Sequence, residues 1–147
     1  MVNAAAQVLL VHPGGPFFKR RDAGVWSIPK GLCGADEPLE AAARREFREE
    51  LGFEPPSELH PLGFVKQNGG KLVHAWTFSG EWDTSKLVSN SFVLEWPKGS
   101  GKLQSFPEVD RAEFFDAAEA HEKIIVAQRP FIERALEWAR GRGAVEP

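Results

Sequence analysis

Three glutamates lie close together in the segment 31–53, with the spacing of one helical face. At ~100° per residue, Glu46, Glu49 and Glu50 fall within an arc of ~100°. That arc overlaps the apolar stripe of the same predicted helix, which consists of Leu39, Ala42, Ala43, Phe47 and Leu51. A helix covered with solvated salt bridges would instead place its acids opposite the stripe. The pattern therefore directs these carboxylates toward the protein core.

Carboxylates at the edge of a core need compensation, because they repel one another and lose hydration. Arg45 can reach Glu49 at i+4, but it supplies only one positive charge. Clustered carboxylate oxygens are the ligands that hard divalent cations prefer, so the sequence predicts a Mg²⁺ or Mn²⁺ site. The alternative is a surface helix whose acids face water.

The limits of this helix can also be predicted. Pro38 suits the first helical position, and Asp36 or Glu37 is the expected cap before it. Gly52 suits a left-handed C-terminal stop.

The rest of the chain predicts an α/β fold. Residues 5–12 form a continuous apolar run typical of a buried strand, and residues 62–67 and 71–80 flank an Asn-Gly-Gly hairpin signal. Further strands are predicted at 91–96 and 111–116, separated by a polar Gly/Pro loop at 97–108. Helices are predicted at 117–124 and from Pro130 to Gly141 or Gly143. We expect layered helices around a mixed sheet, with residues 1–147 forming one domain.

The spacing of the fixed residues resembles the Nudix box of the Nudix hydrolases. All seven fixed glycine and polar positions of that box are present: Gly31, Glu37, Arg45, Glu46, Glu49, Glu50 and Gly52. The two apolar positions of the box hold Phe47 and Phe53, where the family more often has aliphatic residues. The preceding "WSIPKG" is similar to the strand that leads into the box. The resemblance implies a Nudix-type α/β/α sandwich with a mixed sheet, and hydrolysis of a nucleoside diphosphate linked to another moiety.

The resemblance also implies roles for individual residues. The metal carboxylates would be Glu46, Glu49 and Glu50, and one of these would act as general base. Gly31 would offer its carbonyl oxygen to a metal. Arg45 and Glu37 would form the charged pair that orients the helix against its loop. The catalytic residues that the resemblance implies are Glu46, Glu49 and Arg45.

Several residues outside the box are further candidates. Many Nudix enzymes recruit another acid ahead of the last strand, where this chain has Glu108, with Glu95 as the competitor. Lys30 and Lys66 could contact phosphates, and Trp26 could stack on a base. Core packing is expected for Trp76 and Trp138, and a hydrogen-bonded, partly buried position for His74.

The substrate is less well defined. Markers of diadenosine polyphosphate and ADP-ribose enzymes, a downstream Tyr and a Pro about fifteen residues beyond the box, are missing. The segments "WSIPKG" and "FPEVDRAEFF" resemble a bacterial group of predicted nucleoside triphosphate pyrophosphohydrolases. Hydrolysis of a phosphoanhydride is therefore expected, with a diadenosine polyphosphate or nucleotide-sugar hydrolase and a non-catalytic nucleotide-sensing module as alternatives.

Composition excludes several other classes. The net charge of −3 argues against a nucleic-acid binder. The single cysteine, Cys33, excludes an internal disulfide and a Cys-rich zinc site. The start of the chain does not resemble a signal peptide and no apolar run could cross a bilayer, so we expect a cytoplasmic protein without a membrane partner.

Overall fold

The computed structural model describes residues 1–31 and 33–145, which contain three α-helices and three antiparallel strand pairs. The helices are α1 (Leu39–Leu51), α2 (Ala117–Lys123) and α3 (Arg129–Val145). The strand pairs are β1 (Val8–Pro13) with β6 (Val109–Phe115), β2 (His60–Lys66) with β3 (Leu72–Thr77), and β4 (Ser91–Glu95) with β5 (Leu103–Pro107). None of the described helices is long and apolar enough to cross a membrane.

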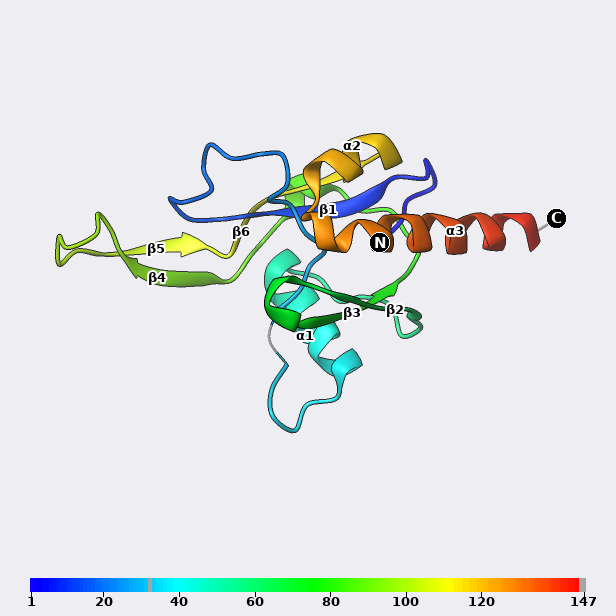
Figure 1. Ribbon diagram of the computed structural model, residues 1–147, viewed down its shortest axis with the longest axis horizontal. Coiled ribbons are helices and arrows are strands. Elements are labelled where there is room, and N and C mark those ends of the chain that lie inside the picture. Colours follow the sequence, from blue (N-terminus) through cyan, green and yellow to red (C-terminus); the bar gives the residue numbers. More distant parts are fainter. Residues whose placement is uncertain (32, 146–147) are drawn as a thin grey trace.

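The strands β1, β2, β3 and β6 lie between helices. Helix α1 packs on β3 and β6, and α3 packs on β1 and β2; Figure 1 shows α1 on the opposite side of the β2–β3 pair from α2 and α3. This is the α/β/α arrangement expected from the sequence. The ladders are all antiparallel within the described chain, and the parallel pairings are the isolated bridges Val2–Ser79 and Trp26–Ile124.

Strand β1 explains why its sequence is apolar without alternation. Leu9 and Val11 lie in the core cluster that contains Leu51 of α1, whereas Leu10 lies in the cluster that contains Ile132 of α3. Both faces of the strand are therefore buried, as a continuous apolar run predicts.

Helix α1 ends as predicted but begins differently. Gly52 has φ +90° and its N–H donates to the carbonyl of Arg48 at 2.8 Å, so the left-handed stop is confirmed. At the other end, Pro38 is itself the N-cap and the first helical residue is Leu39. The predicted side-chain cap is wrong, because the carboxylate of Glu37 instead accepts hydrogen bonds from Arg45 and Gly34.

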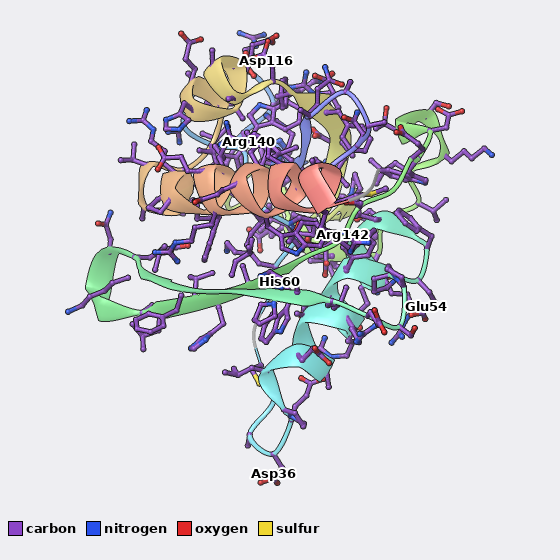
Figure 2. The ribbon with its side chains drawn as sticks, turned by 90° about the vertical axis from the view of Figure 1, so that its right-hand side faces the viewer. Asp36, Glu54, His60, Asp116, Arg140 and Arg142 are labelled. Atoms are coloured by element: carbon purple, nitrogen blue, oxygen red, sulfur yellow. The ribbon has the colours of Figure 1, made fainter. Side chains whose placement is uncertain are left out.

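The other proposed cap, Asp36, lies at the tip of the loop before α1 (Figure 2). Leu39, assigned to the apolar stripe, is 47% exposed at the first turn of the helix.

The segment 97–108 is not the loop that was predicted, because it contains β5. Residues Leu103 to Pro107 pair with β4 in a regular antiparallel register, and the hairpin extends away from the other strands (Figure 1). Strand pairing uses backbone groups, so a solvated strand needs no alternation of apolar and polar residues. The sequence of this segment therefore contains no pattern that predicts β5.

The last helix continues past its predicted end to Val145. A glycine in a helix interior is less favourable than alanine by about 1 kcal/mol, a cost that does not by itself end the helix. The ring of Trp138 stacks on His60, with 5.4 Å between centroids, and the guanidinium of Arg142 lies 5.0 Å from the centroid of Trp138. Trp138 is partly buried in this contact.

Candidate metal and phosphate site

Two glutamates of α1 meet a third acid from the end of the β4–β5 hairpin. Glu46 and Glu50 are one helical turn apart, and Glu108 is the residue between β5 and β6. One carboxylate oxygen from each lies within 4.8 Å of those of the other two. We call Glu46, Glu50 and Glu108 the glutamate cluster.

Backbone hydrogen bonds hold Glu108 in register with the helix. The N–H of Asn90 donates to the carbonyl of Glu49 at 2.8 Å, and the N–H of Glu108 donates to the carbonyl of Asn90 at 2.8 Å. The carbonyl of Glu108 also accepts from Gly14 at 2.9 Å. The backbone of Glu108 is therefore fixed by hydrogen bonds through both its N–H and its carbonyl group.

Glu50 is the most buried member of the cluster, with 9% of its surface exposed. Its Oε2 accepts a hydrogen bond from the backbone N–H of Lys30 at 3.0 Å. Burial is the main cause that raises the pKa of Glu50 to about 8. The hydrogen bond from the N–H of Lys30 lowers this pKa, and the neighbouring charges of Glu46 and Glu108 raise it. Desolvation and the charges of Glu46 and Glu49 likewise raise the pKa of Glu108.

These properties fit a divalent cation. Three carboxylates within reach of one point are an oxygen donor set for a hard cation. Burial and the mutual charges of the acids raise the pKa values of Glu50 and Glu108, and a bound cation would offset both effects. Gly31 lies against the cluster so closely that a Cβ there would overlap the carboxylate of Glu46. Glycine at position 31 thus allows the Glu46 carboxylate to occupy its present place.

Arg45 ties the cluster to the loop before α1. Its guanidinium donates to Glu37 at 2.9 and 3.0 Å, to Glu46 at 2.8 Å and to Glu49 at 3.1 Å. Hydrogen bonds from Arg45, and then from the N–H of Gly34, lower the pKa of Glu37 to about 2. The same hydrogen bonds from Arg45 to Glu37 and Glu46 raise the pKa of the guanidinium. The predicted i+4 contact between Arg45 and Glu49 is confirmed.

The two other predicted acids lie outside the glutamate cluster. Glu49 is directed to Arg45, and about a third of its side chain is exposed. Glu95 lies in the β4–β5 hairpin, where its carboxylate accepts from the N–H of Gly99 at 2.6 Å. Of the two candidates for the acid outside the box, the structure brings Glu108 and not Glu95 to Glu46 and Glu50.

A pocket of about 150 Å³ opens beside Glu46 and Gly31. Two lysines, Lys30 and Lys71, line it together with Trp76. Cys33 also borders it, with its thiol directed to the carbonyl of Glu37 at 2.9 Å. We call this space the cluster pocket.

Two predicted substrate contacts are absent from the described lining of the cluster pocket. Lys66 is exposed on β2, where it is paired with Leu72 of β3. The strand that packs on α1 is β3, so Lys66 lies on the neighbouring strand. Trp26 is 1% exposed, with its indole N–H donating to Asp22 at 2.8 Å and its ring edge-on to Phe115. A base cannot stack on a ring enclosed in this way, so the prediction for Trp26 is wrong.

The sequence did not identify Trp76 and Lys71 as residues of the cluster pocket. Trp76 is only partly buried and lines the cluster pocket rather than sitting wholly in the core as expected. Its strand alternates, since Val73, Ala75 and Thr77 are buried while His74 and Trp76 are intermediate. The sequence shows this alternation, but it does not show which face of β3 lies against α1. His74 is partly buried, 5.4 Å from the ring of Phe64.

Comparisons with known proteins agree with this geometry. A family model described as the NUDIX domain matches residues 1–135. Among curated proteins, no sequence is significantly similar.

Solved structures with the same fold include three informative ones. The MutT protein of Methanosarcina mazei Go1 is 21% identical, with 95% of this chain and 88% of that one covered at a TM-score of 0.56. The ORF135 protein of E. coli is 21% identical, with 99% and 90% covered at 0.55. The NUDIX domain of Shewanella oneidensis NrtR, solved with ADP ribose, is 20% identical, with 92% and 77% covered at 0.55. At these identities the likeness is one of fold.

Proposed function

Because this chain belongs to the NUDIX family and is a Nudix hydrolase, we propose that it hydrolyses a phosphoanhydride bond in a nucleoside triphosphate or a nucleoside diphosphate derivative. The observation that carries the proposal is the glutamate cluster, in which α1 and the β5–β6 junction bring three carboxylates within 4.8 Å. The cofactor of the proposed reaction is Mg²⁺ or Mn²⁺, the cations that oxygen donors of this kind prefer.

The proposed metal ligands are the carboxylates of Glu46, Glu50 and Glu108, with the Glu49 carboxylate and the carbonyl oxygen of Gly31 as further proposed ligands. A divalent cation bound there would neutralise charge on the phosphoanhydride oxygens and lower the pKa of an attacking water. Either Glu46 or Glu49 accepts the proton of that water in the proposed reaction. Glu49 has the more exposed carboxylate of the two.

Arg45 is the proposed positioning residue of the site. Its contacts with Glu37 join the loop that carries Gly31 to α1, and its contacts with Glu46 and Glu49 restrict their carboxylates. Such preorganisation reduces the rearrangement that the site needs before reaction. Gly52 ends the helix in the left-handed conformation, and a Cβ there would lie 2.7 Å from the carbonyl oxygen of Val88.

The cluster pocket is the proposed site of the nucleoside. Trp76 offers an aromatic wall for a base, and Lys30 and Lys71 offer positive charge for phosphates. The NUDIX domain of Shewanella oneidensis NrtR, which shares this fold, was solved with ADP ribose, and this supports a nucleotide-type ligand for the cluster pocket.

We also propose that residues 1–147 form a single domain. Ile132 and Ala135 of α3 share a core cluster with Val8 and Leu10 of β1, so the two ends of the described chain pack together.

The test is incubation with a panel of nucleotides and Mg²⁺ or Mn²⁺, followed by identification of the products. The panel contains nucleoside triphosphates, nucleoside diphosphate derivatives, diadenosine polyphosphates and nucleotide sugars. Metal-dependent release of a nucleoside monophosphate or pyrophosphate supports the proposal, and the preferred compound decides between the substrate classes. Tight nucleotide binding without turnover of any compound would contradict it and indicate a sensing module.

A further inference from the structure

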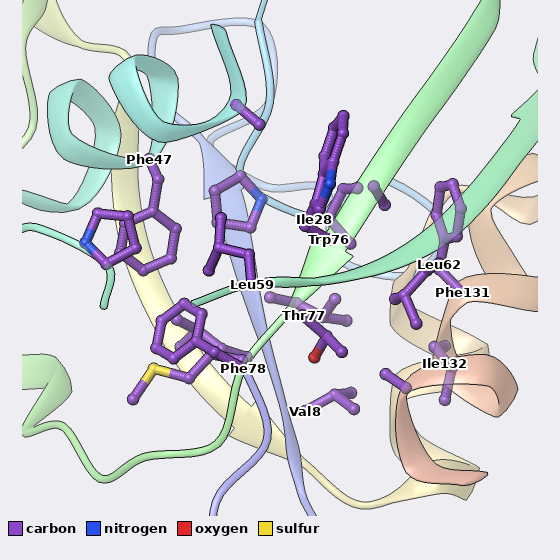
Figure 3. Close-up of a pocket in the computed structure, with 18 of the residues that line it drawn as sticks. Val8, Ile28, Phe47, Leu59, Leu62, Trp76, Thr77, Phe78, Phe131 and Ile132 are labelled. Atoms are coloured by element: carbon purple, nitrogen blue, oxygen red, sulfur yellow. The ribbon is translucent and has the colours of Figure 1, made fainter. Parts of the chain in front are cut away.

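A second cavity, of about 80 Å³, lies between β1, β3, α1 and α3. Figure 3 shows it surrounded by apolar side chains, among them Val8, Ile28, Phe47, Leu62, Phe131 and Ile132. No Asp, Glu, Lys or Arg side chain is among its described lining residues. Met1 is one of them, and burial lowers the pKa of its α-amino group to about 5, which favours the uncharged amine at neutral pH. We call this space the core cavity.

The core cavity contains a polar atom without a partner. Thr77 at the end of β3 is 1% exposed and lines the cavity. Its Oγ1 has no hydrogen-bond partner within the part of the chain that the structure describes. A buried hydroxyl without a partner is unfavourable, and most such groups in native proteins are satisfied. The Thr77 hydroxyl is therefore available to a bound molecule.

Water is a poor occupant of this space. A buried water molecule usually makes two to four hydrogen bonds, and cavities lined by Leu, Ile and Phe side chains stay dry and take up small apolar molecules. Most of the lining of the core cavity is of that kind, and Thr77, His74 and Trp76 are its residues with polar side-chain atoms. Of these, the Thr77 hydroxyl is the buried one that has no partner in the described chain. An occupant with an apolar body and one polar group would match both features.

We propose that the core cavity binds a small uncharged molecule whose apolar body fills the space and whose single polar group hydrogen-bonds to the Thr77 hydroxyl. An ionic ligand is disfavoured because burying a charge among these side chains would be costly. This site is distinct from the glutamate cluster, which contributes no residue to it. The two pockets share walls, since His74 and Trp76 line both.

Phenol and toluene are suitable probes because they have nearly the same shape and differ in one hydroxyl. We expect phenol to bind the metal-free wild-type protein with a Kd on the order of 1 mM. The ratio of phenol affinity to toluene affinity should fall about fivefold when the Thr77 hydroxyl is removed, as the loss of one hydrogen bond would produce. Binding is measured by titration in ¹H–¹⁵N NMR, with shifts expected for residues around the cavity.

Thr77→Val removes the hydroxyl with little change in shape, and Thr77→Ser retains it. The ratio of phenol affinity to toluene affinity should therefore fall in Thr77→Val and stay near the wild-type value in Thr77→Ser. An unchanged ratio in Thr77→Val, or no binding of either probe to the wild type, would overturn the proposal.

A second pair of variants tests the location. Ala135→Leu places a larger side chain in the cavity wall, whereas Ala139→Leu makes the same change on α3 at a partly buried residue that is not among the lining residues. We expect Ala135→Leu to weaken phenol binding at least tenfold and Ala139→Leu to change it less than twofold. Equal binding by both variants would place the probe elsewhere and contradict the inference.

Discussion

Two faces of α1 carry the same residue types in different environments. On one face, Arg48 pairs with Glu54 at 2.9 Å, and half or more of each side chain is exposed; Figure 2 shows Glu54 at the surface beyond the end of the helix. On the other face, Glu46 and Glu50 approach Glu108, and Glu50 is 9% exposed. Surface ion pairs contribute little, whereas clustered buried carboxylates need a cation. Position relative to the core, not charge content, distinguishes a solvated face from a candidate metal site.

The largest difference between the two faces should appear in catalysis. Glu50→Gln and Glu49→Gln should each lower kcat/KM about 10³-fold on the identified substrate, because a loss of several kcal/mol of transition-state stabilisation has that effect. Glu54→Gln, which removes the partner of Arg48 on the exposed side, is the matched control and should change kcat/KM less than twofold. If both Glu50→Gln and Glu49→Gln retained full activity, the metal assignment would be wrong.

The next comparison is between Glu108 and Glu95, the two acids proposed from outside the box. Glu108→Gln should weaken Mn²⁺ binding by about tenfold or more, equivalent to about 1.4 kcal/mol. Glu95→Gln removes a carboxylate that contacts Gly99 within the hairpin and should leave the affinity unchanged. Isothermal titration with MnCl₂ measures both, and a larger loss for Glu95→Gln would reverse the assignment.

A third comparison concerns stability without metal. With a chelator at pH 9, Glu50→Gln should raise the free energy of unfolding by about 2 kcal/mol and the melting temperature by about 5 °C, because it removes a buried charge. Saturating Mg²⁺ should reverse the order, since the wild type would then gain more from the metal. Thermal unfolding under the two conditions checks this prediction. A Glu50→Gln variant that is less stable than wild type in chelator would contradict the view that the buried charge of Glu50 destabilises the metal-free protein.

The smallest effect is expected at the Glu37–Arg45 pair. The pKa of Glu37 is lowered to about 2 in the folded protein, so its ionised form contributes stability above its ordinary pKa of 4.5. That contribution is lost as the pH falls from 4.5 through about 2. Glu37→Gln should therefore lower the melting temperature by a few degrees at pH 7, and the difference from wild type should shrink below pH 4.5. A difference that stayed constant with pH would indicate a packing effect instead of an ion pair.

The site was predictable where a local pattern carried the information. The fixed spacing and helical phase of Glu46 and Glu50 predicted their common inward face, and Gly52 predicted the end of α1. Strand β5 was not predictable, because it is held by backbone pairing with β4 and has few buried side chains to leave a period in the sequence.

The tryptophans show why three-dimensional information was needed. Trp26 and Trp76 both lie in apolar sequence, and aromatic character alone does not say which one is enclosed. Trp26 is covered because His12 and Phe115 pack against its ring, contacts that come from distant segments. Tertiary packing also explains why Lys71 and not Lys66 lines the cluster pocket, since α1 packs on β3, the strand that follows Lys71.

The most direct test of the metal site is anomalous diffraction from crystals grown with MnCl₂. We expect a manganese peak within coordination distance of the carboxylate oxygens of Glu46, Glu50 and Glu108. Disappearance of that peak in Glu50→Gln crystals would add further support. A wild-type crystal whose manganese peaks all lay away from these three carboxylates would contradict the account.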